Sequence, residues 1–288
     1  MVSIDDLSRI RLEEPERIAH VLAHRPRAEP PRPDEKLMII AADHPARGSL
    51  GVTNHPAAMA DRRELLRRCI AALNRPGVDG FLGTADLVED LTLLGALDHK
   101  LVYGSMNRGG LANSRFEIDD RFTGYTTEAI RQAGLDGGKM LLRLDLDDPA
   151  TAATMEASAR AVDALAAAGL TAMVEPFISH RERGRLVNDL STDAVVKSAA
   201  IGSGLAGTSA RTWLKLPLVP DMNAVAAAST MPMLILGGEV DHDAEAKAHG
   251  WAQALRVPGI EGLVIGRSLL YPRDDDVEKA VDRVVGLI

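Results

Sequence analysis

The sequence is poor in cysteine and has no long apolar segment. Cys69 is the only cysteine among 288 residues, which excludes an intramolecular disulfide framework and the paired-cysteine spacing of a zinc knuckle. It lies in LLRRCIAAL, a helical pattern in which we expect a buried core thiol. No apolar run approaches the length of a membrane span, and residues 1–20 lack the apolar centre of a signal peptide. We therefore expect a cytoplasmic protein that does not enter a membrane.

Positive charge is also in short supply. Lysine and arginine together number 33 against 41 acidic residues, which gives a formal net charge of −8. An acidic chain is poorly suited to nucleic acid or to anionic membrane surfaces as its main partner. A local basic pocket for a small anionic metabolite is compatible with this balance, so we expect a small-molecule partner. The hydrophobic content of 46% is sufficient for a globular core.

The chain divides at about residue 36. Residues 3–24 carry apolar side chains at helical spacing and predict one amphipathic helix, and the proline-rich, charged segment 25–36 predicts a linker. Residues 1–36 are thus expected to form a helix and linker that precede a catalytic domain at 37–288.

Within that domain, short apolar segments alternate with longer helical patterns. The predicted strands are 37–42, 78–82, 101–104, 139–145, 171–176, 212–216, 231–236 and 262–265. The predicted helices are 56–73, 85–97, 149–168, 193–201, 243–255 and 274–287. The apolar runs are nearly continuous, as expected for parallel strands that helices cover on their outer side.

This alternation predicts an α/β protein with a (β/α)8 TIM barrel and an extra N-terminal helix. A doubly wound open sheet is the alternative. No glycine-rich dinucleotide fingerprint follows the first strand, which argues against a nucleotide-binding version of that fold. In a barrel the active site lies at the carboxyl ends of the strands, so the polar residues there are the candidates.

Lys215 is the most informative of these residues, because it interrupts the apolar run RTWLKLPLVP. Lysines are few, and the others are expected on helices or near the opposite mouth of the barrel, where Lys36, Lys100 and Lys139 precede or open their strands. A buried lysine has a lowered pKa, so its amine can attack a carbonyl and form a Schiff base. The alternative is a structural lysine that pairs with a carboxylate such as Glu175.

Two carboxylates lie at the ends of predicted strands, and the strand of Glu175 is expected to adjoin that of Lys215, whereas the strand of Asp43 lies farther round the lumen. Asp43 follows the first strand and Glu175 ends the fifth, so both can reach the same lumen as Lys215 and transfer protons there. The alternative is that either one merely neutralises Lys215 or an arginine.

Glycines follow the last two strands. Gly237 and Gly238 come after the seventh strand, and Gly266 and Arg267 after the eighth, where many barrels bind phosphate through backbone amides. Arg143, on the fourth strand, is a further candidate for binding substrate or phosphate. The alternative is that these glycines only form tight turns.

Metal binding has weaker support. Asp43, His44, Glu175 and His180 could supply oxygen and nitrogen ligands at one mouth, and Asp241-His242-Asp243 forms a second group. Neither set has a defined ligand spacing such as His-Glu-x-x-His. We therefore predict no metal and no cofactor.

Five short motifs, in this order, resemble class I (Schiff-base) aldolases of the deoxyribose-phosphate, fructose-bisphosphate and tagatose-bisphosphate aldolase superfamily. They are AADH, VEPF, WLKLP, LGGE and VIGRS, and they span residues 37–270. The resemblance implies a (β/α)8 barrel, a Schiff base on Lys215, and acid–base roles for Asp43 and Glu175. It also implies phosphate-binding loops at 237–238 and 266–267, and a homo-oligomer.

Within that superfamily the sequence is most similar to aldolase-like barrels found with inositol-catabolism enzymes. This implies a phosphorylated ketose or keto-acid, with 6-phospho-5-dehydro-2-deoxygluconate as the candidate substrate. The loop GGEVD departs from the serine-containing loop of several phosphosugar members. A metal-dependent aldolase, decarboxylase or epimerase, and a sugar-phosphate-binding barrel without turnover, are the two alternatives.

Overall fold

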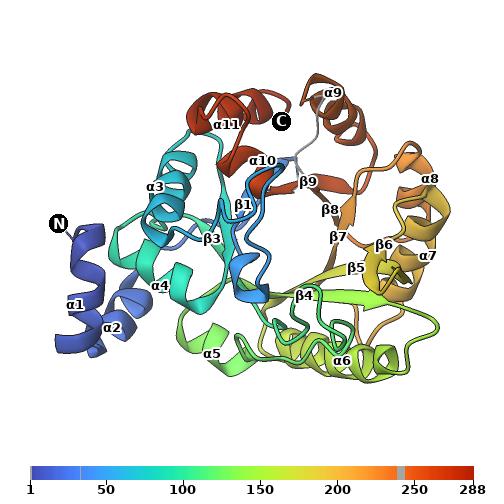
Figure 1. The fold of residues 1–288 in the computed structure, drawn as a ribbon, viewed down its shortest axis with the longest axis horizontal. Coiled ribbons are helices and arrows are strands. Elements are labelled where there is room, and N and C mark those ends of the chain that lie inside the picture. Colours follow the sequence, from blue (N-terminus) through green and yellow to red (C-terminus); the bar gives the residue numbers. More distant parts are fainter. Residues whose placement is uncertain (1, 33, 239–243) are drawn as a thin grey trace.

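The fold is a closed barrel of eight parallel strands surrounded by helices, as predicted (Figure 1). The computed structural model describes residues 2–32, 34–238 and 244–288. The strands, in order round the ring, are β1 (Leu37–Ala41), β2 (Gly80–Gly83), β3 (Leu101–Ser105), β4 (Gly137–Leu144), β5 (Thr171–Glu182), β7 (Thr212–Pro217), β8 (Met233–Leu236) and β9 (Ile260–Ile265). Parallel pairing of β1 with β9, and of β4 with β5, closes the ring and excludes the doubly wound alternative.

Helices follow the strands on the outside of the barrel (Figure 1). They are α3 (Arg62–Leu73), α4 (Ala85–Leu93), α5 (Thr127–Gln132), α6 (Ala150–Ala167), α7 (Thr192–Ser203), α8 (Met222–Ala227), α9 (Ala244–Ala254), α10 (Arg267–Leu270) and α11 (Val277–Val285). The helix predicted from residue 56 begins only at Arg62, because Asp61 accepts a hydrogen bond from the Glu64 backbone N–H at 3.0 Å and caps it there. The short helices α5, α8 and α10 contain too few residues to show a helical period.

The apolar side chains of the strands belong to two hydrophobic cores, one inside the barrel and one between the barrel and the helices. Leu37, Ile39 and Ala41 of β1 point into the lumen, while Met38 and Ile40 pack under the surrounding helices. Because both faces are buried, the strands read as continuous apolar runs. The predicted core thiol, Cys69 of α3, is fully buried, and burial raises its pKa to about 12.

The N-terminal segment is not one helix. A short 3-10 turn (Ile4–Asp6) leads into α1 (Leu7–Glu13), and a separate α2 spans Glu16–His24. Pro15 lies at the break, where its ring prevents a continuous helix. Both helices lie beside α4 (Figure 1), and Arg11 donates to the Asp90 carboxylate at 2.6 Å. They pack against the side of the barrel, and do not cap its amino end.

The proline-rich segment forms no helix or strand in its described residues. It is nevertheless held in place, since the buried Arg25 guanidinium donates to the carbonyls of Leu97 and Lys100 at 2.9 and 2.8 Å. Ala28 then packs against the apolar cluster of the lumen. Thus the linker contributes to the amino end of the barrel. The domain boundary at residue 36 stays a prediction.

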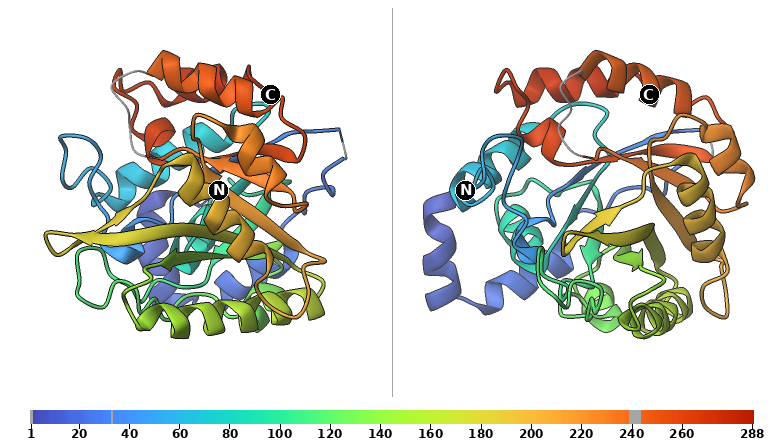
Figure 2. Two further views of the ribbon diagram at one scale, coloured as in Figure 1. Left: turned by 90° about the vertical axis from the view of Figure 1, so that its right-hand side faces the viewer. Right: turned by 45° about the vertical axis from the view of Figure 1, so that its right-hand side comes forward.

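One hairpin was not predicted. Beyond the barrel, β5 continues to Glu182 and pairs antiparallel with β6 (Arg185–Asn188), so that the hairpin projects from the body (Figure 2). Its turn uses Arg183 and Gly184 at φ 49° and 82°, a left-handed pair that usually requires Asn-Gly. The described part of the chain contains no helix that meets the length and apolarity needed to cross a bilayer.

Candidate active site

The carboxyl half of the lumen is occupied by buried charges. Asp43 follows β1, Arg108 follows β3, Lys139 belongs to β4, Glu175 to β5 and Lys215 to β7, and each is at most 8% exposed. Side chains alternate along a strand. On β7, Trp213 packs against the lumen cluster, and Lys215 two residues later points the same way. Charges this deeply buried require partners.

The partners form a continuous chain across the lumen. The Lys215 Nζ lies 2.9 Å from Glu175 Oε1, and the other oxygen of Glu175 makes an ion pair with Lys139. Lys139 Nζ also donates to Asp43 Oδ2 at 3.2 Å. The predicted adjacency of Glu175 and Lys215 is confirmed, because β5 and β7 are neighbouring parallel strands.

The expectation that Lys139 lies near the opposite mouth is wrong. Its strand begins two residues earlier than predicted, at Gly137, and its side chain is inside the lumen with 2% exposure. The long, flexible side chain reaches the carboxylates of Asp43 and Glu175. The lumen therefore holds two candidate amines, and elimination by position along the chain does not separate them.

Asp43 is surrounded by donors. Ser105 Oγ donates to Asp43 Oδ2 at 3.0 Å, and Arg108 Nη2 forms an ion pair with the same oxygen at 3.0 Å. Burial alone would raise the pKa of Asp43, but the neighbouring cations, led by Arg108 and Lys139, hold it well below its usual range. Asp43 is consequently an anion that orients its donors.

The pKa values of Glu175 and Lys139 are shifted together. Burial would raise the pKa of Glu175, yet Lys139 and Lys215 lower it to about 2. Burial lowers the pKa of Lys139 to about 8, against the opposing pull of Asp43 and Glu175. Glu175 is therefore an anion in contact with two amines, a position from which it can carry a proton between Lys215 and a substrate.

His44 stands at the edge of this group. Its Nδ1 lies 4.0 Å from Asp43 Oδ1 and is shielded from solvent without a hydrogen-bond partner among the described residues. Burial, with Arg267 and the lumen lysines, lowers the pKa of His44 to about 3. At neutral pH the ring is therefore uncharged.

The proposed metal ligands do not gather. His180 is half-exposed on the β5–β6 hairpin, where it contacts Glu182 at 2.9 Å. The described residues contain no group of three or more His, Cys, Asp or Glu side chains able to hold a metal ion. The other candidate group, Asp241-His242-Asp243, lies outside the described residues.

The glycine candidates meet at the ends of β8 and β9, which are paired neighbours. Gly238 has a φ of 64°, a backbone conformation that favours glycine. A Cβ on Gly266 would come within 2.3 Å of the Ala41 carbonyl oxygen, so only glycine fits there. The Arg267 Nε that follows is shielded and has no hydrogen-bond partner among the described residues. Backbone freedom and a cation are both available for an anion at this edge.

Arg143 lies elsewhere. It is buried on β4 and forms an ion pair with Glu117, whose carbonyl oxygen also accepts from Arg143 Nη2 at 2.9 Å. Three steps round the ring separate β4 from β8. Arg143 is thus on a strand that does not adjoin the strands of the glycines, and its role in substrate or phosphate binding stays a prediction.

Sequence reasoning missed Lys139, Arg108 and Ser105. Ser105 and Arg108 stood in the run YGSMNR at the end of a predicted strand, which was the available signal. Lys139 opened its predicted strand, so its place gave no indication that the side chain reaches the carboxyl half of the lumen.

Comparison with known proteins gives the family and its structural neighbours. The Cgl0159-like family model matches residues 35–285. A crystal structure of Cgl0159 from Corynebacterium glutamicum is 49% identical, with a TM-score of 0.96 over 100% of this chain and 98% of that one. No curated protein sequence matches. The chain belongs to the Cgl0159-like family.

More distant structures share the fold. An archaeal fructose 1,6-bisphosphate aldolase is 18% identical, with a TM-score of 0.65 over 94% of this chain and 98% of that one. A Schiff-base-forming fructose-1,6-bisphosphate aldolase is 19% identical, with a TM-score of 0.63 over 94% and 99%. At these sequence identities the structural similarity shows that the barrel fold is shared and does not show a shared reaction.

Proposed function

We propose that this member of the Cgl0159-like family is a class I aldolase, a carbon–carbon lyase that acts through a Schiff base on Lys215. The observation that carries the proposal is a buried amine, 4% exposed, 2.9 Å from a carboxylate in a closed lumen. A structural lysine would need one counter-charge. Here Glu175 also pairs with Lys139, so one negative charge is shared between two lysines.

The proton balance of such a reaction fits these groups. Glu175 takes the proton of the Lys215 ammonium, and the free amine attacks the substrate carbonyl to give a carbinolamine. The protonated Glu175 then returns a proton to the carbinolamine hydroxyl, which leaves as water and gives the iminium. The iminium withdraws electrons while the adjacent carbon–carbon bond breaks, and a base removes the proton of the substrate hydroxyl.

Lys139 has a supporting part in this proposal. Its ammonium, held between Asp43 and Glu175, keeps Glu175 ionised in the free enzyme and places a second cation beside Lys215. Lys139 is also the competing nucleophile, so the test must identify the modified residue.

The substrate we propose is a phosphorylated ketose or keto-acid. The phosphate would lie at Gly237, Gly238, Gly266 and Arg267, and Asp43 would orient substrate hydroxyls. Within this class the specific candidate is 6-phospho-5-dehydro-2-deoxygluconate, from the sequence resemblance to barrels of inositol catabolism. No metal or cofactor is needed for the Schiff-base route.

Borohydride trapping tests the proposal. The enzyme is incubated with 6-phospho-5-dehydro-2-deoxygluconate or a panel of phosphoketoses, reduced, digested and analysed by mass spectrometry. We expect the adduct on Lys215 and neither adduct nor turnover in Lys215→Met. Turnover retained by Lys215→Met and abolished by a chelator would replace the proposal with a metal-dependent lyase. Ligand-dependent thermal stabilisation without any product would favour a binding protein.

The setting we propose is a homo-oligomer in the cytoplasm that binds small metabolites and neither nucleic acid nor membranes. Light scattering at micromolar concentration tests the assembly, and a single species of 30.8 kDa would contradict it.

A further inference from the structure

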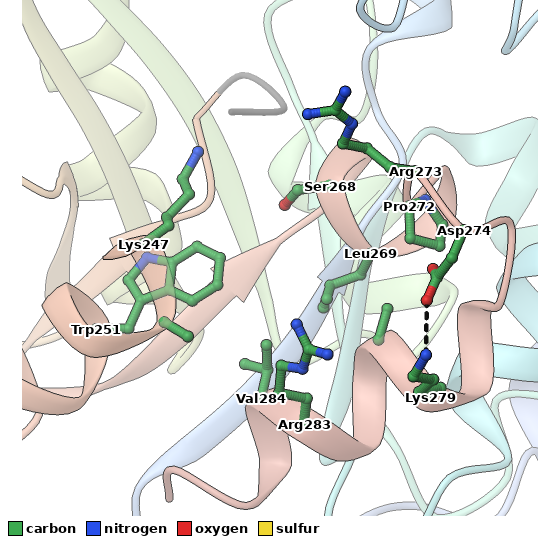
Figure 3. A pocket seen from close by; sticks show the side chains of 12 residues that line it. Lys247, Trp251, Ser268, Leu269, Pro272, Arg273, Asp274, Lys279, Arg283 and Val284 are labelled. Atoms are coloured by element: carbon green, nitrogen blue, oxygen red, sulfur yellow. Dashed lines mark hydrogen bonds and ion pairs between the residues drawn. The ribbon is translucent and has the colours of Figure 1, made fainter. Parts of the chain in front are cut away.

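A pocket lies outside the barrel, between α9, α10 and α11 (Figure 3). Its volume is about 240 Å³, and none of the charged lumen residues lines it. Pockets for drug-sized ligands occupy about 300–1,000 Å³, so this one suits a ligand with a single ring.

The floor of the pocket is apolar. Trp251 of α9, Leu269 of α10 and Val284 of α11 line it and are each at most 4% exposed, and Pro272 adds a further apolar edge. A flat indole and three aliphatic side chains offer dispersion contact to a planar apolar body.

Four cationic side chains line the pocket, namely those of Lys247, Arg273, Lys279 and Arg283. Among the described lining residues Asp274 is the single acidic one, and it is bonded to Lys279 at 2.9 Å. Arg283 makes no ion pair with any residue that the structure describes, and in Figure 3 its guanidinium extends from α11 toward Leu269. An exposed guanidinium beside an apolar floor suits a carboxylate or phosphate.

One hydroxyl in the pocket wall has no partner. The Ser268 hydroxyl of α10 is shielded from solvent and has no hydrogen-bond partner among the described residues. A Cβ on Gly237 would lie 3.3 Å from its oxygen, so the hydroxyl faces the end of β8 and not the open space of the pocket. The Arg283 guanidinium is therefore the group that we expect to hold an anion here.

We propose that this pocket binds an organic anion in which one apolar ring carries a phosphate or carboxylate. The ring packs on Trp251, Leu269 and Val284, while the anionic group pairs with Arg283. This site is separate from the lumen and does not depend on the aldolase proposal.

Tryptophan fluorescence can report its occupancy, because the chain has two tryptophans and only Trp251 lines the pocket. In the Trp213→Phe protein the signal comes from Trp251 alone. Phenyl phosphate is the probe, with inorganic phosphate as the anion without a ring and phenol as the ring without a charge. We expect saturable quenching by phenyl phosphate with a Kd in the millimolar range or below, and much weaker binding of the other two.

Variants on this background locate the site. Arg283→Gln should weaken binding about three- to tenfold, and Ala280→Phe, which fills the pocket, should abolish it. Arg185→Gln on the distant hairpin and Lys215→Met in the lumen should leave the Kd unchanged. Equal affinity for phenol and phenyl phosphate, unchanged binding in Ala280→Phe, or loss of binding in Lys215→Met would overturn the proposal. Circular dichroism of each variant distinguishes lost binding from lost folding.

Discussion

Two lysines contact one carboxylate, and their roles can be separated at the residue scale. Lys139 also pairs with Asp43, whereas Lys215 has Glu175 as its ion-pair partner among the described residues. The less constrained amine is the better nucleophile, because fewer ion pairs have to break before it reaches a carbonyl. The more constrained one is better placed to stabilise the carboxylates.

The first prediction concerns Lys139→Met. We expect the borohydride adduct to remain on Lys215 while turnover falls about 10²–10³-fold, as is typical when a preorganised electrostatic contact in an active site is removed. In Lys215→Met the adduct should disappear although Lys139 is intact. Peptide mapping of both reduced variants checks this. An adduct on Lys139 in the unmodified enzyme would exchange the two roles.

The second prediction assigns different steps of the reaction to Glu175 and Asp43. Glu175 contacts the Lys215 amine, so Glu175→Gln should slow Schiff-base formation itself. Asp43 lies on the far side of Lys139 and is bonded to Ser105 and Arg108, so Asp43→Asn should retain more trapping than turnover. Each variant should lose about 10²–10⁴-fold in kcat.

Trapping rates compared with steady-state rates decide between these roles. Rapid trapping in Glu175→Gln together with lost trapping in Asp43→Asn would reverse the assignment. Glu182→Gln, on the exposed end of the same strand β5, serves as the matched control and should keep both rates.

At the scale of elements, the segment between β3 and α5 is held over the barrel mouth by buried arginines. Arg47 makes an ion pair with Asp120 and donates to the Gly110 carbonyl at 2.6 Å, and Asp120 in turn accepts from the Gly110 N–H at 2.9 Å. The same segment carries Arg108, which reaches Asp43. The contacts among Arg47, Asp120 and Gly110 therefore hold in place a segment that carries a residue of the candidate site.

The third prediction tests the ion pair between Arg47 and Asp120 with Arg47→Met. The change leaves the Asp120 carboxylate buried without its cation, which typically costs about 3–5 kcal/mol in the free energy of unfolding. Arg63→Met, which breaks the exposed pair with Asp5, should cost at most about 1 kcal/mol. Urea unfolding measures both, and equal losses would show that the segment is not held by this pair.

Element positions were largely predictable, and the failures have local physical causes. The eight strands were found because each is an apolar run buried on both faces. Pro15 splits the first helix, a break that its residue type signals but that the helical spacing of the apolar residues hid. Arg183 takes a left-handed conformation in the hairpin turn, which its residue type does not reveal. Lys139 shows the corresponding limit for sites, because a long side chain can act several ångströms from the Cα that sequence position defines.

For the molecule as a whole, the ring order decides which strand-end residues meet. Parallel strands joined by helices follow one another round a barrel, so the meeting of Glu175 and Lys215 could be predicted, and β5 pairs with β7 as expected. The substrate could not be predicted in the same way. It depends on loop conformations, such as the buried pairing of Arg143 with Glu117, which no periodic pattern in the sequence encodes.

The last prediction concerns the acid stability of the folded chain. The pKa of Glu175 is about 2 in the folded protein against an ordinary value of 4.5, so the unfolded state binds this proton more readily. Its contribution to stability is therefore fully present above about pH 5 and is lost as the pH falls toward 2. A shift of this size corresponds to about 3 kcal/mol. Asp43, whose pKa is also lowered, acts in the same direction.

Glu175→Gln removes that contribution while it keeps the shape of the side chain. At pH 7 we expect the variant to be less stable than the unmodified protein by about 3 kcal/mol, and the difference to be roughly halved at pH 3. Glu182→Gln, whose carboxylate is exposed, should change stability by less than about 1 kcal/mol at either pH. Urea unfolding between pH 7 and pH 3 measures the three proteins. A difference that stays constant or grows as the pH falls would contradict the prediction, because it would mean that Glu175 takes up its proton at the same pH in the folded and unfolded states, or at a higher pH when folded.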